Sequence, residues 1–465
     1  MNSSRRNFLR KTSLAGAGLA VAPIFSNAQG ITPPPAAGAQ YMGDFAAPKL
    51  ETVRCAFIGV GARGSGHAQQ IAEIEGTEVV AISDLYEDWA KRSADVCAEK
   101  GKGSRHKNIK LYTGGQNEWK KMLKEVKPDA VFICTPWELH APMAIEAMKQ
   151  GAHTFVEVPL SLTIKETWDL VDTSEKTQKH CMMMENVNYG REELLYLNMC
   201  RQGVIGELLH GEAAYVHELR GQMNEVERGT GSWRTPHYAK RNGNLYPTHG
   251  LGPVAQYMNL GRGEDNFKRM VSFSSPAKGR QLYAAKNYDK DHKWNKFDYK
   301  GGDMNTSIIK TTLGRTIMVQ WDETSPRPYT RHNLIQGTKG TLAGFPNRIA
   351  LEGGVGTATE SHHQWAEKDQ LLEMYEKYEH PLYVRLGELA KKMGGHGGMD
   401  FIMRYRIIEC LHKGQPLDQN LYEGCFWSVV GPLSEASVAQ DGDPQAFPDF
   451  TRGNWKNTKP LDIIG

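Results

Sequence analysis

Two side chains that can move protons lie three residues apart in the segment 243–253. Tyr246 and His249 stand in Asn244-Leu245-Tyr246-Pro247-Thr248-His249-Gly250, bracketed by glycine and proline. Residues three apart share one face of a helix, so a helix start here would present a phenol and an imidazole together. Either residue alone is more often structural than catalytic. The pair predicts acid–base groups, because imidazole and phenol side chains both serve in proton transfer.

A glycine-rich turn near the N-terminus has the spacing of a nucleotide site. The apolar run 53–58 leads into Gly59-Val60-Gly61-Ala62-Arg63-Gly64, and a helical pattern follows from His67 to Glu75. In that context Gly59 permits the tight turn, Gly61 lets the backbone approach a pyrophosphate, and Gly64 lets the helix pack on the strand. The free N–H groups at the start of the helix would face the phosphates. The pattern predicts a Rossmann dinucleotide-binding domain.

The second strand of this domain ends in a carboxylate. Residues 78–83 form the strand, and Asp84 follows 20 residues after Gly64. A carboxylate there can bind both ribose hydroxyls and repels a 2′-phosphate. The sequence therefore predicts NAD rather than NADP.

Polar residues also follow the next three apolar strands. The strand 130–134 is followed by Thr135-Pro136-Trp137-Glu138-Leu139-His140 and then by a helix over 142–150. The next strand is followed by Glu157-Val158-Pro159, and the strand 181–185 is followed by Asn186. Ligands of open α/β sheets bind at the carboxyl ends of the strands. These residues are candidates for the cofactor site, although Trp137 and His140 would also suit a capped turn with a packed ring.

The pattern changes after Asn186. A helix is expected over 191–202, alternating segments over 208–220, 268–275, 304–322 and 329–336, and helices over 364–393 and 400–413. Such alternation is typical of a mostly antiparallel sheet with one buried face. The expected fold class is α/β. A Rossmann domain (51–188) precedes an α+β substrate domain with a large, mostly antiparallel open sheet (189–465), whose C-terminal helices could pack back on the first domain.

The first 28 residues have the three parts of an export signal. Ser4-Arg5-Arg6-Asn7-Phe8-Leu9 resembles a twin-arginine signal, a mild apolar stretch runs from Leu14 to Phe25, and Ser26-Asn27-Ala28 is a small-x-small cleavage site. The alternative is a disordered basic N-terminus. The signal predicts a periplasmic protein exported by the twin-arginine machinery after folding, so a cofactor could be inserted first. Residues 29–50, with three consecutive prolines from Pro33, are expected to be an extended linker.

Composition excludes several other classes. The net charge is +3, the pI is about 8.3, and no long basic run is present, so nothing favours nucleic acid or an anionic membrane. The leader is too short and glycine-rich to span a bilayer. The seven cysteines show no CxxC pairing and no histidine at metal spacing, and no metal site is expected.

Several of these motifs resemble the glucose–fructose oxidoreductase family. That family shares the Thr-Pro-x-x-x-His turn and usually ends the following strand in Glu-Lys-Pro, where the lysine acts as acid and base beside the hydroxyl being oxidised. Here Val158 replaces the lysine. By this resemblance the cofactor machinery is kept while the dehydrogenase base is lost, which indicates NAD used without net oxidation.

A closer resemblance covers the chain from about residue 51 to its end. Glu157-Val158-Pro159, Met182 to Glu192, Gly229 to Thr235 and Tyr246 to Gly250 resemble glycoside hydrolase family 109, the NAD-dependent α-N-acetylgalactosaminidases. The resemblance implies two sets of contacts. NAD would touch Ala62, Arg63, Asp84, Trp137, His140, Glu157, Val158 and Asn186, and the sugar would touch Tyr215, Arg234, Tyr246, Pro247, Thr248, His249 and Tyr329.

The same resemblance implies the chemistry. Oxidation at C3 of a terminal α-linked N-acetylgalactosamine acidifies the proton on C2, the aglycone leaves by elimination, water adds, and C3 is reduced again, so a tightly bound NAD is recycled. His249 or Tyr246 would move protons, and Tyr329 would either transfer a proton or bind sugar. A homodimer is expected by family analogy. The alternatives are a periplasmic NAD-dependent sugar or inositol dehydrogenase, and a non-catalytic NAD-bound sugar-binding protein.

Overall fold

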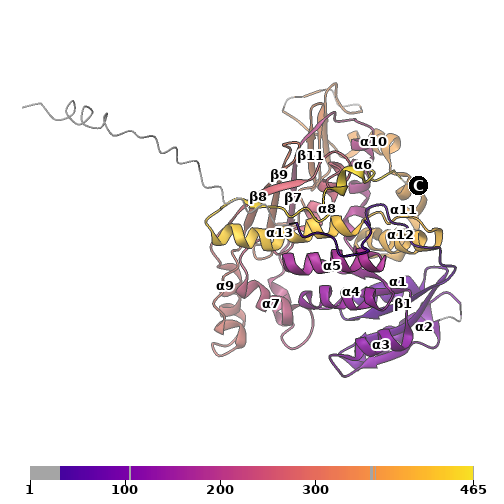
Figure 1. Ribbon diagram of the computed structural model, residues 1–465. Coiled ribbons are helices and arrows are strands. Elements are labelled where there is room, and N and C mark those ends of the chain that lie inside the picture. The colour runs from indigo at the N-terminus through magenta and orange to yellow at the C-terminus, as the bar shows by residue number, and fades with distance from the viewer. Residues whose placement is uncertain (1–31, 104–105, 357–359, 362, 464–465) are drawn as a thin grey trace, which may run out of the picture.

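The computed structural model describes residues 32–103, 106–356, 360–361 and 363–463. The predicted export signal over 1–28 and its cleavage site lie outside these residues. Two sheets form the frame, one for each predicted domain (Figure 1). Within the described part of the chain, no helix combines the length and apolar character needed to cross a membrane.

The N-terminal sheet is parallel and has the strand order β3-β2-β1-β4-β5-β6. Strands β4, β5 and β6 are short and fully buried, as expected for a sheet that helices cover on both faces. The strands are β1 (Val53–Ile58), β2 (Thr77–Asp84), β3 (Lys110–Thr113), β4 (Ala130–Ile133), β5 (His153–Val156) and β6 (Cys181–Met183). The helices are α1 (Gly64–Ala72), α2 (Glu87–Lys100), α3 (Glu118–Val126), α4 (His140–Lys149) and α5 (Ile164–Thr177). The first helix begins at Gly64 and not at His67, because the last glycine of the turn is already helical.

The second sheet has nine strands in the order β14-β13-β12-β11-β7-β10-β9-β8-β15. All pairs are antiparallel except β7 with β10, so the expected mostly antiparallel sheet is confirmed. The segment 304–322 is two strands of a hairpin, not one. The strands are β7 (Leu208–Val216), β8 (Phe267–Ser274), β9 (Asn305–Thr311), β10 (Thr316–Asp322), β11 (Leu334–Gly337), β12 (Gly340–Ala343), β13 (Arg348–Leu351), β14 (Ala366–Glu367) and β15 (Gln445–Ala446).

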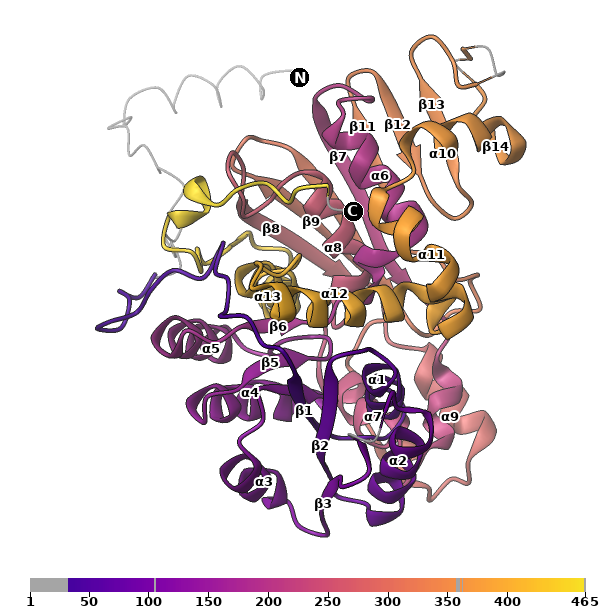
Figure 2. The ribbon, with the colours of Figure 1, turned by 90° about the vertical axis from the view of Figure 1, so that its right-hand side faces the viewer.

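Helices cover one face of this sheet and bridge to the first domain (Figure 2). Helix α8 packs on β7, α13 on β8, and α6 on α8. Helix α12 reaches α1 and β1, and α13 reaches α5 and β6, so the C-terminal helices do pack back on the Rossmann domain. The helices are α6 (Arg191–Arg201), α7 (Thr230–Lys240), α8 (Thr248–Tyr257), α9 (Gly279–Asn287), α10 (Leu372–Tyr378), α11 (Pro381–Met393), α12 (Met399–Lys413) and α13 (Leu421–Ala439).

The expectation of one helix over 364–393 is wrong. The segment begins with β14 and a 3-10 turn at Lys368–Leu371, and α10 ends before the extended residues Glu379 and His380. Proline disfavours helical geometry in the residue before it, so α10 ends before Pro381 and a separate helix, α11, begins at this proline.

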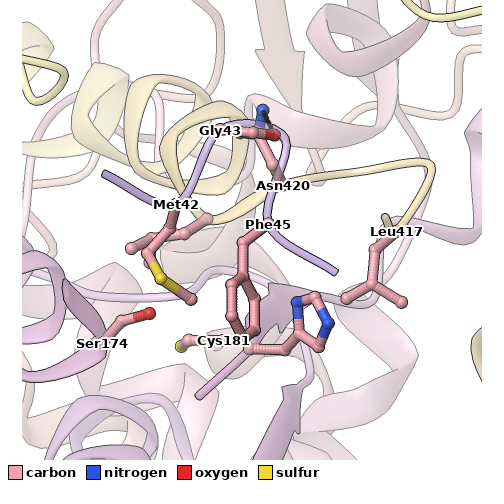
Figure 3. A pocket seen from close by; sticks show the side chains of 9 residues that line it. Met42, Gly43, Phe45, Ser174, Cys181, Leu417 and Asn420 are labelled. Atoms are coloured by element: carbon pink, nitrogen blue, oxygen red, sulfur yellow. Dashed lines mark hydrogen bonds between the residues drawn. The ribbon is translucent and has the colours of Figure 1, made fainter. Parts of the chain in front are cut away.

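The segment 32–50 contains no helix or strand but is docked along its length. The Met42 N–H donates to the hydroxyl of Tyr422 at 3.1 Å, and Tyr41 stacks on the same ring. The Leu50 N–H donates to the Leu411 carbonyl at 3.1 Å. Figure 3 shows Met42 and Phe45 beside Ser174, Cys181 and Asn420 around a cavity of about 10 Å³. That space suits one water molecule, so the cavity is no substrate site.

Candidate functional site

The glycine-rich turn has the geometry that a dinucleotide requires. Gly59 has φ +83°, and a Cβ on Gly64 would lie 1.9 Å from the Gly59 carbonyl oxygen. Asp84 ends β2, where its carboxylate accepts the N–H groups of Val60 at 2.7 Å and Tyr86 at 2.8 Å. The carboxylate thus lies directly against the turn, as a ribose ligand must. These residues fit NAD.

A buried charge network joins this turn to Glu157. The Arg63 guanidinium lies 3.2 Å from Glu157 and 3.0 Å from Asp400 of α12, and His67 Nε2 lies 2.7 Å from Glu157. Burial alone would raise the pKa of Glu157, but the charge of Arg63 and the hydrogen bond from His67 hold it well below its usual range. Burial and the charge of Arg404 lower the pKa of His67 to about 4, so this ring is neutral at pH 7.

Asn186 enters the same network. It opens the 3-10 turn Asn186–Tyr189 and donates its side-chain N–H to Asp400 at 2.6 Å. Asp400 therefore connects the second domain to three predicted cofactor residues, because Arg63 in turn pairs with Glu157.

The turn after β4 is tightly packed. Both ring nitrogens of His140 face carbonyl oxygens, that of Pro159 at 2.7 Å and that of Thr135 at 2.8 Å. Burial lowers the pKa of His140. A neutral imidazole has a single N–H, so the ring donates to one of these carbonyl oxygens and is buried between the two turns that carry them. Val158 is buried in the core and brings no charge to the end of β5.

The predicted proton-transfer groups meet at the start of α8. The rings of Tyr246 and His249 are centred 4.9 Å apart, and Tyr215 of β7 lies 4.8 Å from Tyr246 and 5.2 Å from His249. His249 Nδ1 lies 2.6 Å from a carboxylate oxygen of Glu185, which is fully buried. A carboxylate only accepts, so Nδ1 carries the proton and Nε2 is left for substrate. Burial raises the pKa of Tyr246, although the charge of Arg234 opposes this rise.

Arg234 lies beneath these rings on α7. Its guanidinium lies 5.1 Å from the ring centres of both Trp137 and Tyr246, and its Nε is buried without a hydrogen-bond partner. The hydroxyl of Thr248 is also buried and unpaired. Unpaired buried polar atoms are costly, so both are candidates for hydrogen bonds to a polar ligand.

Tyr329 lies at the outer edge of the cluster. Its ring is 6.1 Å from that of Tyr215, and its hydroxyl accepts a hydrogen bond from Arg331 at 2.8 Å. Burial raises the pKa of Tyr329, and Arg331 opposes the rise.

Pro247 is the N-cap of α8, so it shapes the turn that presents Tyr246 and His249. The predicted sugar residues therefore lie together.

Two histidines were missed by the sequence analysis. His217 lies just beyond β7 with its ring parallel to that of Tyr215 at 5.7 Å and 4.9 Å from that of Tyr329. His396 Nδ1 lies 2.9 Å from Asp400, and more than half of its side chain is exposed. In the sequence, His396 is marked by the glycine residues on either side of it, Gly394-Gly395-His396-Gly397-Gly398. In the structure every residue of this run has a positive φ. No sequence signal marked His217.

Within the described ranges, no group of three or more His, Cys, Asp or Glu side chains is arranged to hold a metal ion.

The fold and site define a two-domain enzyme that places an NAD-type turn beside a cluster of tyrosine, histidine and arginine. Solved structures share this fold. The structure of a levoglucosan dehydrogenase in complex with NADH and levoglucosan shares the fold with a TM-score of 0.62 and 16% sequence identity, covering 86% of this chain and all of that chain. A scyllo-inositol dehydrogenase from Lactobacillus casei matches with a TM-score of 0.57 and 12% identity, covering 86% of this chain and 99% of that chain.

Family models divide the chain at the same place as the two sheets. The model described as "Oxidoreductase family, NAD-binding Rossmann fold" matches residues 53–185, and "Glycosyl hydrolase 109, C-terminal domain" matches residues 189–457. "Glycosyl hydrolase family 109 protein 1" from Akkermansia muciniphila is 62% identical over 100% of this chain and 99% of the relative. "Alpha-N-acetylgalactosaminidase" from Shewanella oneidensis is 53% identical over the same shares. The chain belongs to glycosyl hydrolase family 109 and is a glycoside hydrolase with an NAD-binding Rossmann domain.

Proposed function

We propose that this enzyme hydrolyses terminal α-linked N-acetylgalactosamine from glycans or glycoconjugates by transient oxidation at C3, with no net redox change. One observation carries the proposal: the sheet that bears the intact NAD-type turn has the neutral, buried Val158 at the end of β5, whereas His249, oriented by Glu185, and Tyr246 form a pair suited to proton transfer. The family membership and the name of the Shewanella oneidensis relative support the substrate.

The residues of the NAD site would hold the cofactor in place during the reaction. The turn at Gly59–Gly64 and Asp84 would hold its phosphates and ribose, and the Arg63–Glu157 pair would lie beside the nicotinamide end. Bound NAD supplies a reversible acceptor for the hydride of C3. A ketone at C3 makes the C2 proton acidic enough for a modest base. Ordinary glycosidases need two positioned carboxylates, which this route does not.

His249 and Tyr246 are the proposed proton-transfer groups at the C3 hydroxyl and C2. Glu185 fixes the tautomer of His249, so that Nε2 is a base aimed away from the carboxylate. Tyr246 is held in its neutral, proton-donating form by burial, which raises its pKa. An imidazole base next to a neutral phenol is suited to removing one proton while donating another.

His396 is a proposed third proton-transfer group. Like His249, it pairs Nδ1 with a carboxylate, here Asp400, but its ring is exposed at the rim rather than buried. A rim position suits proton exchange with the departing aglycone oxygen or with the entering water. Arg234, Tyr215, Thr248 and Tyr329 are the proposed contacts to the sugar hydroxyls and the acetamide group.

The second candidate is a periplasmic sugar or inositol dehydrogenase with net NAD turnover. The dehydrogenase fold of the solved relatives favours it. Val158 opposes it, because a dehydrogenase of this type needs a base where this chain has an apolar side chain. The family membership favours the hydrolase as well.

We further propose that the protein is exported by the twin-arginine route to the periplasm and acts as a homodimer. The sequence of residues 1–28 supports the export route. A protein exported after folding could leave with NAD already bound, and a recycled cofactor needs no NAD supply outside the cytoplasm.

The test is incubation of the purified enzyme with an aryl α-N-acetylgalactosaminide and no added NAD. Release of the phenol over many turnovers, with no accumulation of NADH in solution, is the expected result. Added NAD should not increase the rate. Activity that depends stoichiometrically on added NAD would show the dehydrogenase function instead.

A further inference from the structure

The segment 225–240 of the second domain returns to the Rossmann domain at two separate places. One contact is with the first turn of α2, just after β2, and the other with the turn after β4. In the sheet order β1 lies between β2 and β4, so the glycine-rich turn after β1 lies between the two contacts. A dinucleotide held by that turn would lie under segment 225–240.

The first contact is made by Arg228. Its guanidinium donates to both carboxylate oxygens of Asp88, at 3.0 and 2.9 Å, and lies 5.3 Å from the ring centre of Tyr86 and 5.0 Å from that of Trp89. A single nitrogen, Nη1, makes both contacts to the carboxylate, and the planar guanidinium lies over the two aromatic rings at the same time.

These partners surround the proposed adenosine end of the cofactor site. The Tyr86 N–H donates to Asp84, the predicted ribose ligand, and a Cβ on Gly61 would lie 2.7 Å from the Trp89 ring. Burial raises the pKa of Asp84, and the positive charge of Arg228 acts against that rise. Arg228 is therefore close enough to Asp84 to act on its charge.

The second contact is more deeply buried. His237 lies 3.1 Å from Glu138, and Trp233 packs against Trp137 with ring centres 5.2 Å apart. Trp137 is almost fully buried and the His237 side chain is 18% exposed, although Glu138 is 53% exposed; the side chains of Arg228 and Asp88 are 46% and 59% exposed. The weaker, solvent-exposed contact is thus the one at the adenosine end, and it is the end that would open first.

We propose that segment 225–240 is a strap that keeps NAD in its site and that Arg228 is the latch of this strap. Arg228 is a positioning residue, since it acts by holding the strap closed and not on the reacting atoms. The inference rests on the proposed function, in which one NAD molecule serves many turnovers and its release must be slow.

The test measures how fast bound NAD exchanges. Wild type, Arg228→Ala, Arg228→Lys and the control Arg220→Ala are loaded with isotope-labelled NAD and chased with excess unlabelled NAD. Arg220 is a matched control, because its ion pair with Glu218 and its ring contact with Tyr283 stay within the second domain. Exposed ion pairs and cation–π contacts are modest, so Arg228→Ala should speed NAD loss by about tenfold, with Arg228→Lys between it and wild type.

The outcomes separate the latch from the proposed function. Equal exchange rates for Arg228→Ala and wild type, with both retaining NAD, would overturn the latch and leave the recycled cofactor intact. Fast exchange already in wild type would contradict the recycled cofactor itself. Thermal melting of each NAD-free protein shows whether Arg228→Ala damages the fold; a faster loss with an unchanged melting temperature supports the latch.

Discussion

The proposed chemistry depends on one buried carboxylate that orients one imidazole. Glu185 follows β6 in the Rossmann domain, and His249 opens α8 in the second domain, so the pair forms only when the two domains are assembled. The second oxygen of Glu185 is buried without a partner, which is a costly arrangement. A carboxylate kept in this state is better explained by its effect on His249 than by stability.

Replacement of the proton-transfer groups should lower the rate with little change in stability. His249→Ala and Tyr246→Phe are each expected to reduce kcat by about 10²- to 10⁴-fold, the usual contribution of a general acid or base. Steady-state kinetics and thermal melting measure the two effects. His210→Ala, at a partly exposed position of β7, is the control. Near-normal turnover in both site variants would return the cluster to a structural role.

Loss of the Glu185 charge should disturb His249 without removing it. Glu185→Gln keeps the shape but offers an amide that can either donate or accept, so the tautomer of His249 is no longer fixed. We expect kcat to fall by roughly 10- to 100-fold while KM changes little, measured on an aryl substrate. An equal loss through KM alone would show that Glu185 serves substrate binding instead.

At the scale of elements, the sequence predicted those features that depend on residues close together in the chain. The glycine turn, Asp84 and the strand ends were found because their spacing is short and their context is strand–turn–helix. Asp400 could not be found in this way, since its contacts to Arg63 and Asn186 join segments more than 200 residues apart in the chain. The interruption at Glu379–His380 was missed although Pro381 marked it.

The glycine turn offers a matched test within one helix. In Gly64→Ala the new Cβ would lie 1.9 Å from the Gly59 carbonyl oxygen, whereas a Cβ on Gly66 meets nothing within 4 Å. Gly64→Ala should lose bound NAD and stability, and Gly66→Ala should keep its NAD and gain up to about 1 kcal/mol, the usual helix preference for alanine. Nucleotide content after denaturation and thermal melting give the answer. Full NAD content in Gly64→Ala would contradict the packing that defines this site.

At the scale of the whole molecule, the docking of the N-terminal segment 32–50 could not be predicted from its composition. Its prolines and alanines are typical of a linker, yet Met42 and Ala47 are buried and Tyr41 packs on α13. The partners that hold it come from residues near 411 and 422, far along the chain. Only the complete fold shows that the residues just before the first strand pack against the two domains.

Buried histidines should make the fold acid-sensitive. Burial lowers the pKa of both His153 and His180 to about 3, whereas an unfolded histidine titrates near pH 6.5. Below that value the unfolded chain binds protons that the folded chain does not, so the free energy of unfolding should fall as the pH drops from about 6.5 towards 4.

His180→Phe isolates this effect, because His180 Nε2 has no hydrogen-bond partner and its ring packs on Phe45. Denaturant unfolding of the variant should show a shallower loss of stability with acid than wild type. Comparison at pH 8 removes any change in packing. An unchanged slope would mean that these buried rings do not control acid stability.

The central claim is that C2–H breaks during hydrolysis, and isotope exchange tests it most directly. Hydrolysis of an aryl α-N-acetylgalactosaminide in D₂O, followed by mass spectrometry and NMR of the released sugar, reports the hydrogen at C2. Elimination predicts deuterium at C2 of N-acetylgalactosamine, provided that the base exchanges its proton with solvent before reprotonation. It also predicts cleavage of a thioglycoside at a rate comparable to its oxygen analogue. Only protium at C2, together with an inert thioglycoside, would contradict the account and indicate carboxylate-based hydrolysis.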